Sequence, residues 1–127
     1  MQKLSVLVVD DEPEVLPLLH RMLIRLGDYA VQSESSPLLA LDRIRSEHFD
    51  IVLTDVEMPQ MLETALCHEI RSVSPTTLTI LMSGSEPPQT AALVGAFTFL
   101  RKTFSLPEVR SVMKIAEEAI DERLKPG

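Results

Sequence analysis

Acidic side chains stand where two short apolar runs of the sequence end. Asp10-Asp11-Glu12 follows the run at residues 4–9, and Asp55 follows the run at residues 51–54. A carboxylate can act as a nucleophile toward phosphorus and form an acyl phosphate. Crowded carboxylates repel each other, and a hard divalent cation with oxygen ligands, such as Mg²⁺, relieves that repulsion. The pattern therefore indicates a magnesium site beside Asp55.

A hydroxyl and an ammonium group stand at the ends of two further apolar runs. Ser83 follows residues 79–82, and Lys102 comes just after residues 96–100. A phosphoryl group in transfer carries charge on its outer oxygens, which an ammonium and a hydroxyl would hold. Each residue alone has a plainer interpretation, because acids and serines beside strands usually form turns or cap helices, and a lone lysine usually lies on the surface. Only the combination favours phosphoryl chemistry.

The elements that must position these residues alternate between short apolar runs and segments of helical periodicity. This alternation predicts repeated strand–helix units and an α/β domain with a doubly wound parallel sheet. The site in such a sheet lies beyond the carboxyl ends of the strands, so all four positions would share one edge. The predicted strands are 4–9, 29–33, 51–54, 79–82 and 96–100, and the predicted helices are 15–26, a segment opening at Ser36-Pro37, 61–73, 87–94 and 105–124.

The helical periodicity also assigns side chains to the core. Pro17 falls inside the first predicted helix, where we expect it to remove one backbone hydrogen bond and to kink or delay the helix. Ser105 and Glu108 fit a capping box at the start of the last helix. The residues expected to face the core are Leu38, Leu41 and Ile44 in the second helix and Leu62, Ala65, Leu66 and Ile70 in the third.

The composition is that of one globular domain, which we expect to span residues 1–124, with 125–127 as a tail or the start of a linker. The net charge of −7 argues against nucleic-acid binding, which needs lysine and arginine, and against an anionic membrane surface. Cys67 is the only cysteine, so no internal disulfide can form and a reducing compartment is expected. The run at 4–9 is too short for a signal sequence or a membrane span, and we expect a cytoplasmic protein.

Four segments resemble those of the response-regulator receiver family, the phosphoacceptor domain of two-component signalling. They are VLVVDDE at residues 6–12, TDVEMPQM at 54–61, ILMSG at 80–84 and FLRKTF at 99–104. The resemblance covers essentially the whole chain, and the acidic cluster together with D-x-x-M-P is its specific part. It implies a flavodoxin-like (βα)5 fold with five parallel strands, in agreement with the alternation of elements.

The resemblance implies a role for each acidic residue. Asp55 would be the phosphoacceptor. Mg²⁺ would be bound directly by Asp11 and Asp55, with Asp10 acting largely through water. The backbone carbonyl of Glu57 would be the remaining protein ligand.

The switching residues are implied in the same way. Ser83 would swing to the phosphoryl group, and Lys102 would pair with it. Phe99 stands where the family keeps a rotamer-switching aromatic residue, although an aromatic residue on a strand is usually buried in the core. Segments 87–94, 96–100 and 105–124 would then form the partner surface that shifts on phosphorylation.

The resemblance also implies partners. A sensor histidine kinase or a phosphotransfer protein would donate the phosphoryl group. A downstream output protein or a fused output domain would respond, and a phosphorylation-dependent homodimer fits the same scheme. The domain would catalyse only its own aspartyl phosphorylation and dephosphorylation, so we do not expect an enzyme acting on other substrates.

The sequence departs from the family pattern near the site. Lys102-Thr103 replaces the usual Lys-Pro, whose bond is commonly cis, so either the bond is trans and Lys102 sits differently or strain is stored there. Met61-Leu62-Glu63 lacks the usual turn glycine, and the stretch from Ser83 to Lys102 is shorter than usual by nearly one helical turn. Phe99 has no hydroxyl, so any aromatic switch would work by packing alone.

Two alternatives stay open at this point. The departures fit a receiver-like scaffold or docking module that no longer depends on phosphorylation. Glu57, two residues after Asp55, fits the second acid of a metal-dependent phosphatase, although it matches the receiver ligand position better. A nucleotide-binding flavodoxin-like protein is disfavoured, because Asp10-Asp11-Glu12 stands where a glycine-rich phosphate loop would be needed.

Overall fold

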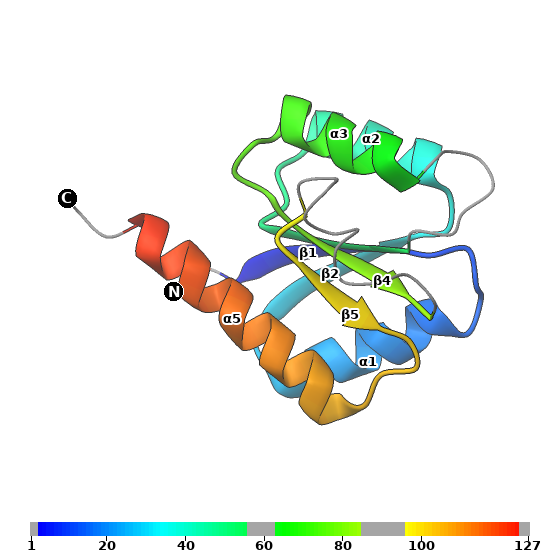
Figure 1. Cartoon of the computed structure of the whole chain (residues 1–127), viewed down its shortest axis with the longest axis vertical. Helices are drawn as coiled ribbons and strands as arrows, with labels where there is room; N and C mark the ends of the chain where they lie inside the picture. The colour runs from blue at the N-terminus through cyan, green and yellow to red at the C-terminus, as the bar shows by residue number, and fades with distance from the viewer. Residues whose placement is uncertain (1–2, 56–62, 85–95, 125–127) are drawn as a thin grey trace.

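The computed structural model of the chain describes residues 3–55, 63–84 and 96–124. Within these residues, five parallel strands form one sheet in the order β2-β1-β3-β4-β5 (Figure 1). Strands and helices follow the predicted order, which confirms the α/β, flavodoxin-like fold class. The strands are β1 (Leu4–Val9), β2 (Tyr29–Glu34), β3 (Ile51–Asp55), β4 (Leu78–Ser83) and β5 (Thr98–Arg101), and the described helices are α1 (Val15–Leu26), α2 (Pro37–Ser46), α3 (Glu63–Val73) and α5 (Leu106–Leu124).

The sheet separates two hydrophobic cores. Helices α1 and α5 cover one face, and α2 and α3 cover the other (Figure 1). Successive side chains of a strand point to opposite faces, and β1 shows this alternation. Val6 and Val8 pack in the core with α1 and α5, whereas Leu7 and Val9 pack in the core with α2 and α3.

The strands that carry the acidic residues lie inside the sheet. Every residue of β3 is buried, and so are the last four residues of β1. In β2, by contrast, only Tyr29 is buried, as is typical of a strand at an edge of the sheet. Because inner strands of a parallel sheet are covered on both faces, the core fixes the ends of β1 and β3 firmly.

Two expectations about the helices are wrong. The buried stripe of α2 consists of Pro37, Ala40, Leu41 and Ile44. This i, i+3, i+4, i+7 spacing leaves Leu38 on the flank, where it is 51% exposed. Helix α1 begins at Val15, so Pro17 lies in its first turn, where a backbone N–H has no acceptor within the helix, and no hydrogen bond is lost.

The last helix begins as predicted. The Ser105 N–H donates to Glu108 Oε1 at 3.0 Å, and the Glu108 N–H donates to Ser105 Oγ at 3.4 Å, which confirms the capping box. In α3, Leu66 and Ile70 are buried as expected. The helix predicted at 87–94 and the start of the one predicted at 61–73 lie outside the described residues, and so do the side chains of Leu62 and Ala65.

Candidate functional site

Adjacent strands bring the acidic residues to one edge of the sheet. Asp10 directly follows β1, and Asp55 is the last residue of β3. The two strands pair in parallel with Val9 opposite Thr54, so Asp10 and Asp55 come next on neighbouring strands. The backbone N–H of Asp10 donates to the carbonyl of Glu34 at 3.1 Å, which extends the pairing with β2 and holds Asp10 in place.

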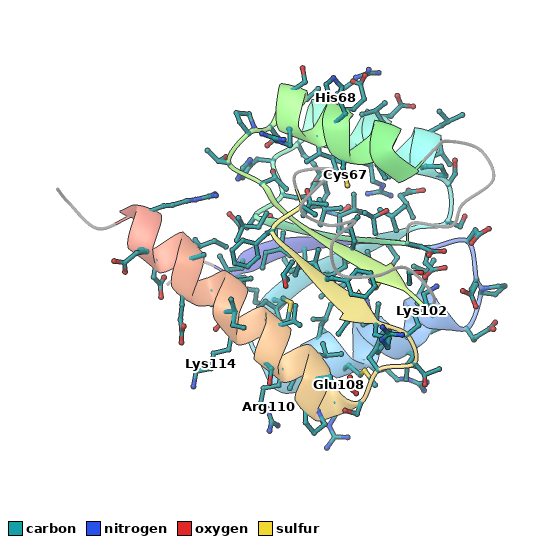
Figure 2. The ribbon with its side chains drawn as sticks, in the orientation of Figure 1. Cys67, His68, Lys102, Glu108, Arg110 and Lys114 are labelled. Carbon is teal, nitrogen blue, oxygen red and sulfur yellow. The ribbon has the colours of Figure 1, made fainter. Side chains whose placement is uncertain are left out.

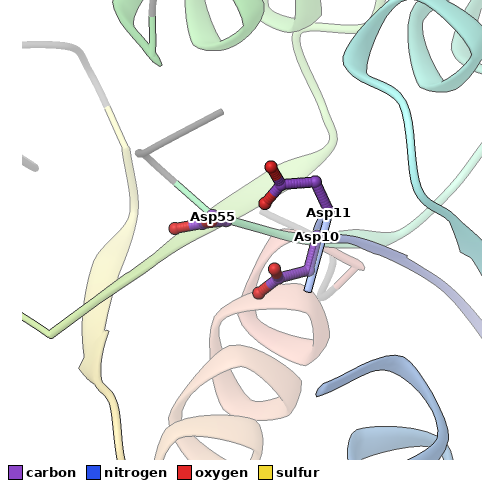
Figure 3. Close-up of side chains that lie close together, drawn as sticks. All are labelled: Asp10, Asp11 and Asp55. Carbon is purple, nitrogen blue, oxygen red and sulfur yellow. The ribbon is translucent and has the colours of Figure 1, made fainter. Parts of the chain in front are cut away.

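The carboxylates of Asp10, Asp11 and Asp55 converge. One oxygen from each lies within 4.8 Å of the others, and Figure 3 shows the three carboxylates close together on one side of the backbone that carries them. Asp10 has 0% and Asp55 3% of its surface exposed, whereas Asp11 is exposed. The predicted convergence is therefore correct. One open side and two buried ligands are what a cation that also keeps water ligands would require.

Burial in this cluster destabilises the charged form of Asp10. Its Oδ1 accepts a hydrogen bond from the Glu12 N–H at 2.9 Å. Its buried Oδ2 lies 2.8 Å from Lys102 Nζ as an ion pair, but makes no well-aligned hydrogen bond within the described residues. Burial raises the pKa of Asp10, because the loss of solvation outweighs the help from Lys102 and from the Glu12 N–H. The Lys102 ammonium thus offsets only part of the cost of burying this carboxylate, and a divalent cation at the cluster would offset more of it.

Lys102 supplies the positive charge of the site. It lies in the loop that follows β5 (Figure 2), and its Nζ is 2.8 Å from Asp10, 2.6 Å from Glu12 and 3.5 Å from Asp55. Only 13% of the side chain is exposed. Burial lowers the pKa of Lys102, but the hydrogen bonds and charges of the surrounding carboxylates raise it more, so the pKa lies above its ordinary value and the ammonium keeps its proton.

The loop around Lys102 is attached to the end of β4. The Lys102 N–H donates to the Ser83 carbonyl at 2.9 Å, and Ser83 is 1% exposed. Asp55 is opposite Met82 in the β3–β4 pairing, so Ser83 lies one residue farther along the same edge. The Lys102–Thr103 peptide bond is cis, as the Lys-Pro bond commonly is in the family that the sequence resembles.

The outcome differs for two other predicted site residues, Phe99 and Glu57. Phe99 packs against Cys67 and Leu81, but it is only half-buried, so its expected burial in the core is wrong. The reason is that β5 is an edge strand with a neighbour on one side only. Glu57 lies outside the described residues.

Glu12 contacts the site although its residue type alone suggested no separate role. It is half-exposed, on the loop after β1, and its carboxylate accepts a hydrogen bond from Lys102 Nζ. The only signal in the sequence that Glu12 contacts the site is its position directly after Asp10-Asp11. The contact joins residues ninety positions apart, so local pattern could not have shown it.

Comparison with known proteins places these features in a known family. The family described as "Response regulator receiver domain" matches residues 6–114. A probable transcriptional regulator, ycf27, of Porphyridium aerugineum is 31% identical over 125 residues, which cover 94% of this chain and 52% of that protein. The chain spans about half or less of the length of the curated relatives that head the comparison.

Solved structures agree with this match. The solution structure of a beryllofluoride-activated NtrC4 receiver domain dimer has a TM-score of 0.82 and 29% identity, covering 91% of this chain and 98% of that one. The signal receiver domain of an HD domain-containing protein from Pseudomonas fluorescens Pf-5 has a TM-score of 0.85, and the match covers 97% of this chain and 93% of that one. At 22% identity, the second comparison supports the fold alone. Within the described residues, no helix has both the length and the apolar character to span a bilayer.

Proposed function

Because this chain belongs to the response regulator receiver family, we propose that Asp55 accepts a phosphoryl group and that Mg²⁺ is bound beside it. The observation that carries this proposal is the convergence of Asp10, Asp11 and Asp55 around one point, with the Lys102 ammonium against two of them. A cluster of three acids, two of them buried, and one ammonium has no simpler use in the packing of the fold. It suits a reaction in which negative charge must be gathered and held.

The metal would be held by the residues that the sequence suggests. Asp11 and Asp55 would be direct ligands, Asp10 would act largely through water, and the Glu57 carbonyl would complete the protein ligands. When bound, Mg²⁺ would neutralise charge on the phosphoryl oxygens and on the acids.

Asp55 would act as the nucleophile. One of its carboxylate oxygens forms a bond to phosphorus, while the bond between phosphorus and the donor's leaving atom breaks and the donor departs. Lys102, whose Nζ is 3.5 Å from Asp55, holds the charge on the transferred group, and the Ser83 hydroxyl meets it from the end of β4.

Phosphorylation would then act as a switch. The new charge biases an equilibrium between two packings of the domain. Ser83 moves toward the phosphoryl group, and Phe99, packed against Cys67 and Leu81, repacks without any hydroxyl to guide it. Strand β5 and helix α5, with the segment between β4 and β5, would present the changed surface to a partner.

The proposed partners follow from this cycle. A sensor histidine kinase or a phosphotransfer protein donates the phosphoryl group, and an output protein or a fused output domain responds in the cytoplasm. A second copy of the phosphorylated chain is a further proposed partner. Catalysis is limited to gain and loss of the domain's own phosphoryl group. No observation favours the phosphorylation-independent scaffold, because the acids, Ser83 and Lys102 all remain at one edge.

The test uses acetyl phosphate as donor. With Mg²⁺, the chain should gain one phosphoryl group by intact mass, as the Asp55–phosphorus bond forms and acetate leaves. Asp55→Asn should gain none, while Asp42→Asn, which changes an exposed acid on α2, should behave like the wild type. An adduct that persists in Asp55→Asn, or a wild type that gains nothing, would refute the assignment.

A further inference from the structure

We propose that Glu12 competes with the phosphoryl group on Asp55 for the ammonium of Lys102, so that Glu12 is a positioning residue that opposes phosphorylation. This inference rests on the proposed function of Asp55. It adds a residue that neither the sequence pattern nor the metal cluster assigns to the reaction.

The first argument is the order of the contact distances. Lys102 Nζ lies 2.6 Å from Glu12 Oε1 and 2.8 Å from Asp10 Oδ2, but 3.5 Å from Asp55 Oδ2. The two short contacts are thus made with residues other than the nucleophile. A phosphoryl group on Asp55 would bring strong acceptor oxygens to the same ammonium, which has only three N–H donors, and would therefore compete with these short contacts.

The second argument is which contact can be released. Asp10 has no exposed surface and belongs to the acidic cluster that the cation would bind. The side chain of Glu12 is 50% exposed, while its backbone N–H is held by Asp10 Oδ1 at 2.9 Å. Glu12 can therefore turn its carboxylate into water without any backbone movement, and release of this contact is the least costly way to free Lys102.

The third argument is charge. A short hydrogen bond between an ammonium and a carboxylate is stronger than one between neutral groups, and Lys102 is mostly shielded from water. The contact with Glu12 therefore stabilises the chain before phosphorylation and is lost afterwards. Its removal should shift the balance toward the phosphorylated form.

The experiment measures binding of beryllofluoride, a phosphoryl mimic, at saturating Mg²⁺ by NMR titration of the full chain. Glu12→Gln should lower the apparent Kd about threefold to tenfold, because the ammonium no longer faces a competing charge. Glu14→Gln is the matched control, since it removes an exposed acid two residues away whose side chain makes no capping hydrogen bond to α1. It should leave the apparent Kd within about twofold, since exposed charges are screened by salt.

A second background separates competition from simple repulsion of the anion. In Lys102→Met, the added Glu12→Gln change should have no more effect than Glu14→Gln. An equal gain with and without the lysine would mean that Glu12 only repels the mimic, and this result would overturn the inference. So would a wild-type affinity in Glu12→Gln.

The outcomes also separate the inference from the proposed function. If the wild type does not bind beryllofluoride, the proposed function of Asp55 is refuted, and the proposed competition is refuted with it. If the wild type binds beryllofluoride and Glu12→Gln does not bind it more tightly, only the proposed competition is refuted. Thermal unfolding of each variant shows whether the variant is folded as the wild type is.

Discussion

Oδ2 of Asp10 lies 2.8 Å from Nζ of Lys102, although β3 and β4 separate their strands in the sheet. Neighbouring strands are about 4.8 Å apart, so the Lys102 loop and its side chain must reach across the ends of two strands. The lysine therefore lies over Asp55, which ends the strand next to β1. This ion pair therefore spans the edge of the sheet at which the proposed chemistry takes place.

Loss of this ion pair should destabilise the metal-free chain. In Lys102→Met, Asp10 is buried without its partner, and we expect the free energy of unfolding to fall by about 2–3 kcal/mol. Urea unfolding at neutral pH without divalent cations measures it. Lys114→Met, which changes an exposed lysine on α5 (Figure 2), should change stability little. Equal stability of the two variants would contradict the argument.

Mg²⁺ should stabilise the chain through the acidic cluster. At about ten times its dissociation constant, a ligand that binds only the folded state adds about 1.4 kcal/mol to the free energy of unfolding. We expect this gain in the wild type and its loss in Asp11→Asn, because Asp11 is the exposed member of the cluster and a proposed direct ligand. Asp42→Asn serves as the charge-matched control, and NaCl of equal ionic strength controls for screening. A gain that persists in Asp11→Asn would place the ion elsewhere.

The capping box of α5 should make stability depend on pH. The N–H and O–H of Ser105 donate to Glu108 and lower the pKa of its carboxyl below the ordinary 4.5. The stabilisation is therefore present above that value and is lost as the pH falls through the pKa of the folded chain. Glu108→Gln should be less stable than the wild type at neutral pH, and the difference should shrink in acid. Urea unfolding at a series of pH values measures the difference, with Glu118→Gln, which changes an exposed acid outside the capping box on the same helix, as the control.

Cys67 should react slowly in the folded chain. The thiol is 1% exposed, and burial raises its pKa to about 11. Because the thiolate is the reactive form, labelling by iodoacetamide at mildly alkaline pH should be slower by about a hundredfold or more than in the urea-unfolded chain. Glutathione in the same urea controls for the reagent. Labelling of the folded chain at the rate of a free thiol would show that the packing of Cys67 with Leu81 is loose.

Much of the fold could be predicted from local pattern. The bounds of β1 and of α1 and the capping box of α5 all follow from periodicity and residue type over a few neighbours. The edge on which Asp10, Asp55, Ser83 and Lys102 lie was also predictable, because every parallel strand ends its run at the same side of the sheet. These features depend on short stretches of chain, which is why a single sequence is enough to predict them.

The contacts between those residues depended on the tertiary structure. The order of strands sets β1 beside β3, the hydrogen bond from the Lys102 N–H to the Ser83 carbonyl attaches the loop to β4, and only the folded chain brings Glu12 to Lys102. Phe99 is half-buried because its strand lies at an edge, and Leu38 is exposed because the buried stripe of α2 starts at Pro37. Residue type and spacing thus determined which groups meet at the sheet edge. Distances, burial and charge balance came from packing between segments far apart in the chain, which local pattern does not encode.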